Sequence, residues 1–111
     1  MPSDIKVYLE DILTAAEKIE SYISDLSFEK FTEDCKTFDA VIRNLEIIGE
    51  AAKKLRDDEN CQYSEIDWKK MAGLRDILIH EYFGVDAEIV WDVVQNKLPD
   101  LVKYLHGKLT K

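Results

Sequence analysis

The sequence predicts an all-α protein, and three observations indicate this class. Apolar residues recur at steps of three and four over long stretches, which is the spacing of one face of an α-helix. Helix-forming residues dominate the chain of 111 residues. Only four glycines and two prolines are available for the turns that a sheet requires. We therefore expect a single domain over residues 1–111, an up-and-down bundle of four main helices.

The first main helix is expected over residues 4–26. Ser3 is the expected N-cap, since a serine hydroxyl can accept a hydrogen bond from the first helical turn. A short turn or a single helical turn should follow over residues 27–32, with Phe28 and Phe31 directed inward. The apolar seam of the first helix consists of Ile5, Leu9, Ile12, Ala16, Ile19, Ile23 and Leu26.

The second main helix is expected to begin at Thr32 or Glu33 and to reach about Asp57. Gly49 lies in the middle of it beside two alanines, at a cost of roughly 1 kcal/mol relative to alanine. Such a flat patch allows another backbone to approach, either within the subunit or across a dimer contact, and the sequence leaves both open. Its buried stripe consists of Phe38, Val41, Ile42, Leu45, Ile48, Ala52 and Leu55.

Residues 57–66 lack periodicity and are expected to form a loop, after which Asp67 caps a third main helix. Gly73 should permit close approach inside this helix, and Gly84 should end it. The residues expected to face the core are Trp68, Met71, Leu74 and Leu78.

Asp86 is expected to cap the last main helix. Pro99 should kink this helix near residues 96–98, because its ring excludes one backbone hydrogen bond. His106 is interpreted as a residue of the helix C-terminus that favours the helix dipole, and not as a catalyst. The expected core residues are Ile89, Val90, Val93 and Val94, followed by Leu98, Leu101, Leu105 and Leu109.

The charge of the chain limits its partners. The net charge is −8, and phosphate contacts dominate nucleic-acid affinity, so tight non-specific RNA binding is not expected. Residues 1–39 carry ten acidic and four basic side chains, a net of −6, whereas residues 43–56 carry four basic and two acidic ones, a net of +2. A locally basic groove on an acidic body and a basic protein partner are both compatible with this distribution.

Several functional classes find no support. No apolar run approaches the ~20 residues of a membrane span, and no signal peptide is evident. Cys35 and Cys61 are too few for a disulfide scaffold or a zinc site, so reduced thiols in the cytoplasm are expected. Glu46 and Glu50 stand one turn apart, but Arg43 is nearby and no histidine lies one turn away. We expect an ion-paired or solvated face there, with no metal and no cofactor.

The reactive side chains concentrate in the third helix, expected from Trp68 to Tyr82. Arg75 and Tyr82, seven apart, share a helix face, and Asp76 lies one turn before His80. A phosphate-directed cation, an imidazole and a phenol would therefore sit together at a helix end. The simpler interpretation gives Arg75 a surface ion pair, His80 a half-buried slot and Tyr82 a place in the core.

The segment Arg75-x4-His80-x-Tyr82 matches the R-x4-H-x-Y signature of HepT-type toxins. These are HEPN-domain ribonucleases paired with minimal nucleotidyltransferase antitoxins. The chain also resembles this family in RNLEIIGEAAKKL (43–55), W-x5-LR (68–75) and VW-x6-LPDL (90–101), in the family's order. Residues 1–40 resemble it only in helical character. Asn commonly follows the motif Arg, and this chain has Asp76, which is still able to orient His80.

The resemblance implies a HEPN homodimer with a composite groove and metal-independent endoribonuclease activity. It implies proton transfer by His80, phosphate stabilisation by Arg75 and orientation of His80 by Asp76. It also implies that a nucleotidyltransferase antitoxin transfers AMP from ATP to Tyr82.

One alternative is a catalytically silent helical module that binds a nucleotide or docks the nucleotidyltransferase. A metal-dependent enzyme is a third possibility, for which the sequence offers no convincing ligand set.

Overall fold

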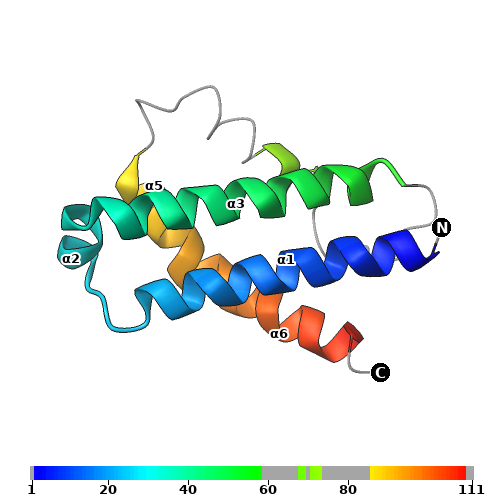
Figure 1. Ribbon diagram of the computed structural model, residues 1–111, viewed down its shortest axis with the longest axis horizontal. Coiled ribbons are helices and arrows are strands. Elements are labelled where there is room, and N and C mark those ends of the chain that lie inside the picture. Colours follow the sequence, from blue (N-terminus) through cyan, green and yellow to red (C-terminus); the bar gives the residue numbers. More distant parts are fainter. Residues whose placement is uncertain (1, 59–67, 70, 74–85, 110–111) are drawn as a thin grey trace.

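The regular elements of this protein are all helical in the part that its computed structural model describes, which is residues 2–58, 68–69, 71–73 and 86–109 (Figure 1). This confirms the predicted fold class. Residues 68–69 and 71–73 are helical as well. The other elements are α1 (Pro2–Ile23), α2 (Phe28–Glu33), α3 (Cys35–Arg56), α5 (Ala87–Asp92), η2 (Val93–Lys97) and α6 (Leu98–Leu109).

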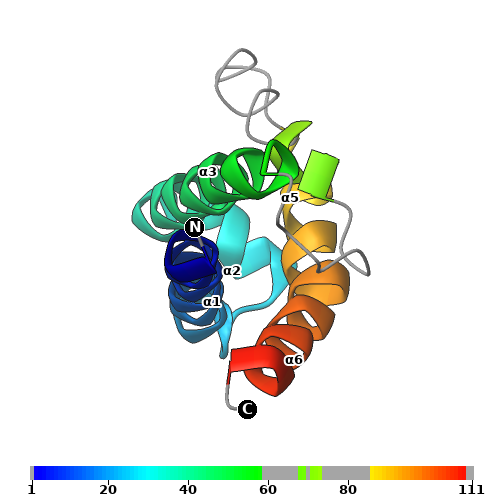
Figure 2. The same ribbon diagram turned by 90° about the vertical axis from the view of Figure 1, so that its right-hand side faces the viewer.

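The two long helices α1 and α3 run antiparallel and form one side of the bundle, with α2 as the corner between them (Figure 1). Helix α6 crosses α1 obliquely on the other side (Figures 1 and 2). The predicted seam of α1 is buried from Ile5 to Ile23, and the predicted stripe of α3 is buried except for Phe38, which is partly covered. Apolar periodicity therefore identified the faces that the helices bury.

The helix ends differ from the sequence-based boundaries. Helix α1 already includes Pro2, so Ser3 falls inside the helix and not before it. Proline suits the first helical turn because its missing N–H has no partner there in any case. Helix α1 ends at Ile23, so Leu26 lies beyond it and is only partly buried.

Helix α3 starts later than predicted because Asp34 caps it. The backbone of Asp34 is extended, and its carboxylate accepts the backbone N–H of Thr37 at 3.1 Å and the Thr37 hydroxyl at 2.7 Å. These hydrogen bonds hold the pKa of Asp34 below its ordinary value of 3.8, with the Thr37 backbone as the largest cause. In the same way Ser27 caps α2 by accepting the Lys30 backbone N–H at 3.2 Å.

The Gly49 patch packs within the subunit. Gly49 is buried, and Ala51 and Ala52 are 6% and 0% exposed in the single chain. Of the two interpretations that the sequence left open, the intramolecular one is therefore correct, and this patch is not a free dimer surface.

An aromatic cluster holds α5 against the α2 corner. Phe31 is fully buried, as predicted, and its ring centroid lies 5.0 Å from that of Trp91 and 5.4 Å from that of Phe38. Phe28 lies 6.1 Å from Trp91 and is half-buried. Tilted aromatic pairs at these distances add stabilisation beyond their buried area. The sequence did not predict that α2 and α5 meet.

A π-helical turn lies just before Pro99, where the sequence predicts a kink. The irregular turn is η2, and the Leu98 N–H bonds back to the carbonyl of Val93, five residues earlier. Proline has no N–H and cannot continue the regular series of backbone hydrogen bonds. The wider π turn accommodates this missing hydrogen bond, and the helix continues as α6. The predicted location of the irregularity is correct, whereas its form is new.

The inward face of the last helix is narrower than predicted. Val90 and Val94 are 2% and 1% exposed, as expected, but Ile89 is 59% exposed. Helix α5 meets the rest of the described chain through its Val90 and Trp91 side, and Ile89 points away from that contact. In α6 the leucine stripe is buried at Leu98, Leu101 and Leu105, and Leu109 is partly covered.

Within the described ranges, no helix has the length and apolar character required to cross a membrane.

Candidate functional site

The four motif residues Arg75, Asp76, His80 and Tyr82 lie outside the described residues. The structure instead describes the residues that precede and follow the motif in the sequence. The first end, before the motif, is the helical stretch at residues 68–73, and the second end, after it, is the start of α5.

The first end has one face in the core and one face in solvent. Trp68 and Ala72 are 7% and 2% exposed, and Met71 is partly buried against the core, which confirms the predicted inward face as far as it is described. Lys69 is exposed. These helical residues lie beside α3 in both views (Figures 1 and 2). The described helical residues that precede the motif in the sequence are therefore packed on the bundle.

Gly73 has no close neighbour from another described element, although the sequence predicts a close approach there. Among the described residues, and apart from its own helix backbone and its chain neighbours, no atom lies within 4 Å of the position that a Cβ would occupy on Gly73. The predicted close approach at Gly73 is therefore not made by the described residues, and it stays a prediction for the rest of the chain.

The second end is a capped helix start. The Asp86 carboxylate accepts the Glu88 backbone N–H at 2.8 Å, as predicted for the N-cap of the last helix. One turn further along α5, the Trp91 ring packs against the aromatic rings of Phe28 and Phe31 in α2. Tyr82 precedes Asp86 by four residues, so the anchored start of α5 limits where the end of the motif segment can lie.

The last turn of α3 is basic. Arg56 donates from Nε and Nη2 to the Asp57 carboxylate at 2.9 and 3.2 Å. This hydrogen-bonded pair, with smaller contributions from Lys53 and Lys54, holds the pKa of Asp57 below its ordinary value. Both lysines are exposed. The last turn of α3 therefore places three basic side chains beside the Asp57 carboxylate, where they also complement the negative end of the helix dipole.

The described residues offer no metal-binding group of three or more His, Cys, Asp or Glu side chains. On α3, Glu46 is half-buried and Glu50 is exposed, with the exposed Arg43 close by in sequence. Cys35 is a free, exposed thiol, and Cys61 lies outside the described residues.

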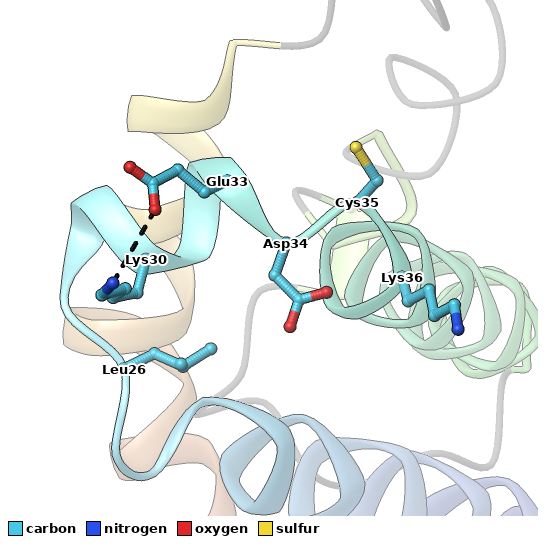
Figure 3. Close-up of a pocket in the computed structure, with 6 residues that line it drawn as sticks. All are labelled: Leu26, Lys30, Glu33, Asp34, Cys35 and Lys36. Atoms are coloured by element: carbon cyan, nitrogen blue, oxygen red, sulfur yellow. Dashed lines mark ion pairs between the residues drawn. The ribbon is translucent and has the colours of Figure 1, made fainter.

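A surface depression of about 440 Å³ lies where α1, α2 and α3 meet (Figure 3). Three of its four charged groups are already engaged: Lys30 and Glu33 form an exposed ion pair at 4.0 Å, and Asp34 caps α3. The Cys35 sulfur points away from Asp34 and Glu33 (Figure 3). No nucleophile is set beside a base here, so this depression has no catalytic geometry of its own. It is lined by Leu26, Lys30, Glu33, Asp34, Cys35 and Lys36.

The architecture is thus a helical bundle on which the residues before and after the motif are packed. A profile of the Ribonuclease HepT-like family matches residues 12–106. The chain belongs to the HepT-like ribonuclease family.

Individual relatives support this membership. A protein of Thermococcus cleftensis named as a probable ribonuclease HepT is 50% identical over 96 residues, which cover 86% of this chain and 87% of the relative. A protein of Methanocaldococcus jannaschii named as a candidate RNase is 48% identical over 100 residues, covering 90% of this chain and 83% of the relative.

A second protein of M. jannaschii combines two names, gamma-glutamylcyclotransferase and RNase. It is 46% identical over 101 residues, which cover 91% of this chain and 46% of the relative. No solved structure matches the chain.

Proposed function

We propose that this chain is a metal-independent endoribonuclease, the toxin of a toxin–antitoxin pair. The observation that carries this proposal is the family match over residues 12–106, which includes a complete R-x4-H-x-Y signature at Arg75, His80 and Tyr82. The relatives named as ribonucleases add support, since they match the chain over most of its length.

The proposed reaction needs three acts that these side chains can perform. The ribose 2′-hydroxyl loses a proton as its oxygen attacks the adjacent phosphorus, and the bond from phosphorus to the 5′-oxygen breaks as that oxygen gains a proton. His80 is the proton-transfer group, because an imidazole titrates near neutrality. Arg75 presents its fork of N–H donors to the phosphoryl oxygens, where negative charge develops. Asp76 orients His80.

We further propose that the active assembly is a symmetric homodimer. Each chain supplies one motif histidine, whereas the reaction needs one base and one acid. Two-fold dimers are the commonest oligomers, and a composite cleft would bring two copies of Arg75 and His80 to one phosphodiester. The patch at Gly49 is already buried within the subunit, which leaves the motif side of the molecule for such a contact.

The proposed regulator is a minimal nucleotidyltransferase antitoxin that adenylylates Tyr82. The Tyr82 oxygen would attack the α-phosphorus of ATP, and pyrophosphate would leave. The attached AMP adds negative charge and bulk beside Arg75 and His80, which would exclude RNA. Co-production with the product of a neighbouring nucleotidyltransferase gene should increase the mass of the chain by one AMP, and Tyr82→Phe should abolish the increase.

The decisive experiment is RNA cleavage by the purified protein in EDTA. We expect the wild type to cut, and His80→Ala and Arg75→Ala each to lose activity by at least about a hundredfold, the usual contribution of a proton-transfer group. His106→Ala is the matched control, because it removes the other histidine. Activity that requires an added divalent cation would contradict the proposal.

The alternative function is a non-catalytic module that binds a nucleotide or the nucleotidyltransferase. It would be favoured if the wild type left RNA intact in EDTA and in Mg²⁺ while still forming a complex with the nucleotidyltransferase.

A further inference from the structure

The outward face of α1 carries two exposed apolar side chains. Val7 is 51% exposed and Tyr22 is 41% exposed, whereas the opposite face of α1 is buried in the core. In Figure 2, α3 lies above α1 and α6 lies to its lower right, and no described helix lies on its left side. Single exposed apolar residues are common on protein surfaces, so exposure alone assigns no partner to this face.

Three polar side chains continue the same face between Val7 and Tyr22. Asp11, Thr14 and Lys18 are all exposed and follow Val7 at helical steps of four and three. At about 100° per residue, the five side chains fall within an arc of about 80°. In the described part of the chain, neither Asp11 nor Lys18 forms an ion pair. The face therefore has an apolar group at each end and one charge of each sign between them.

This order of side chains is complementary to itself. Asp11 follows Val7 by four residues, and Tyr22 follows Lys18 by four. In a pair of antiparallel helices, one register therefore places Val7 opposite Tyr22 of the partner subunit and Asp11 opposite Lys18 of the partner subunit. A two-fold axis beside Thr14 generates each of these pairs twice. The two apolar contacts and the two ion pairs are then satisfied together.

From this self-complementarity we infer that the outward face of α1 binds α1 of a second copy of the chain, antiparallel to it and across a two-fold axis beside Thr14. The inference does not depend on the proposed ribonuclease function. In Figure 1 the helical residues 68–73 lie above α3 and α1 lies below it, so this contact does not cover them. A dimer through the motif side can form at the same time, and the two contacts together would join four or more chains.

The contact is expected to be weak. Two helices that meet from Val7 to Tyr22 touch along about 22 Å. One helix pair of this length buries less than the roughly 1,600 Å² of a standard interface. Glu10 and Glu17 border the face, and their like charges oppose the association of two copies. We therefore expect a Kd on the order of 100 µM, which corresponds to a concentration-dependent equilibrium.

The test reverses the two charges one at a time and then together. The Kd of association is measured by sedimentation equilibrium at chain concentrations from about 1 µM to about 1 mM. Lys18→Asp and Asp11→Lys should each raise Kd about tenfold, because each places like charges opposite one another. The double variant Asp11→Lys/Lys18→Asp should restore the wild-type Kd, since it reverses the ion pairs and keeps the net charge at −8.

Matched controls separate the face from general effects. Lys6 is exposed on α1 but lies about 120° from the centre of the face. Lys6→Asp changes the net charge as much as Lys18→Asp does and should raise Kd less. Tyr22→Gln should also weaken association, whereas Ile89→Gln on α5 should not, although Ile89 is the more exposed side chain at 59%.

A cysteine at position 14 tests where the axis lies. In a chain that carries Cys35→Ser and Cys61→Ser, Thr14→Cys should form a disulfide-linked dimer on mild oxidation, because the two-fold axis brings the two copies of this position together. Lys103 is exposed on α6, so Lys103→Cys in the same background is the control and should cross-link less.

Each outcome decides a different point. A double variant that associates as weakly as the single variants would overturn the inference, as would a wild type that stays monomeric at the highest concentration. A dimer that persists unchanged in all α1 variants and cleaves RNA would support the motif-side dimer and refute the α1 contact. Association that depends on Asp11 and Lys18, without RNA cleavage by the wild type, would support the α1 contact and refute the proposed catalysis.

Discussion

Asp34 determines where α3 begins, and its ionisation makes that helix start sensitive to acid. A carboxyl group whose pKa is lower in the folded state stabilises the fold above its unfolded pKa, and the contribution disappears as the pH falls through the folded pKa. We expect Asp34→Ala to lower the Tm at pH 7. The difference from wild type should narrow as the pH falls below 3.8, the ordinary value for this group. Thermal unfolding monitored by circular dichroism between pH 7 and pH 2 measures this difference.

Asp34→Asn is the control for the cap. Asparagine keeps an oxygen that can accept the Thr37 N–H but carries no charge. Its Tm at pH 7 should lie between those of wild type and Asp34→Ala. A gap between wild type and Asp34→Ala that stayed constant down to pH 2 would show that the carboxylate charge does not contribute.

His106 and His80 are chemically alike, but only His80 belongs to the R-x4-H-x-Y signature. His106 Nε2 lies 3.1 Å from Glu17 Oε2 and joins α6 to α1, with both side chains 49% exposed. Pairs this exposed contribute no more than about 1 kcal/mol. His106→Ala should therefore change the free energy of unfolding by that amount or less and leave RNA cleavage at the wild-type rate. A loss of cleavage in this variant at unchanged stability would place His106 in the active site.

Single residues were predictable from the sequence where local chemistry decides their position. Asp86 was predicted as an N-cap because a carboxylate directly before an apolar helical stretch commonly accepts a backbone N–H of the first turn. The exposure of Ile89 was not predictable, since the apolar pattern does not state how wide a face the neighbouring helices cover.

The aromatic cluster is the element-scale feature that joins α2 to the last helix. Phe31→Ala should lower the free energy of unfolding by about 3–5 kcal/mol, the usual cost of removing a fully buried phenyl ring. This is a large fraction of the roughly 5–15 kcal/mol by which domains of this size are stable. Urea denaturation measures the change. Phe28→Ala serves as the control, because its ring is half-buried and should cost less. Equal losses in both variants would contradict the assigned packing.

The helices themselves were predictable because their apolar stripes are long and regular. The ends of the helices were less predictable than their stripes. Several polar residues near the start of α3 could cap it, and the structure shows that Asp34 does so, because its carboxylate accepts the Thr37 backbone N–H. The contact of Phe31 with Trp91 joins residues sixty positions apart. No local pattern encodes such a contact. The π turn at η2 is likewise one of several responses that a helix has to a proline.

Dimerisation is the prediction that concerns the whole molecule. If one site needs His80 from both subunits, only dimers of two wild-type chains are active. In dimers reassembled from a mixture of wild type and His80→Ala, activity should follow the square of the wild-type fraction, about one quarter at equal amounts. Cleavage rates across a series of mixtures, with the assembly mass checked against the chain mass of 12.9 kDa, measure this. A linear dependence would mean that each subunit cuts alone.

The sequence predicts which residues make up the candidate site, but it does not predict their geometry. The types and spacing of Arg75, His80 and Tyr82 predict the chemistry of the candidate site, and this stays a prediction. Which surfaces of the bundle surround them depends on packing and on assembly. The packed ends at Trp68 and Trp91 are the part of that geometry that the structure adds.

The positions of the two chain ends also affect how this fold can be combined with other domains. Helix α1 starts and α6 finishes at the same end of the molecule (Figure 1). A second domain fused through either end would therefore emerge on that side and leave the opposite corner, where α2 meets α5, uncovered. The two-part relative of M. jannaschii, of which this chain matches 46%, shows that such tandem arrangements occur in nature.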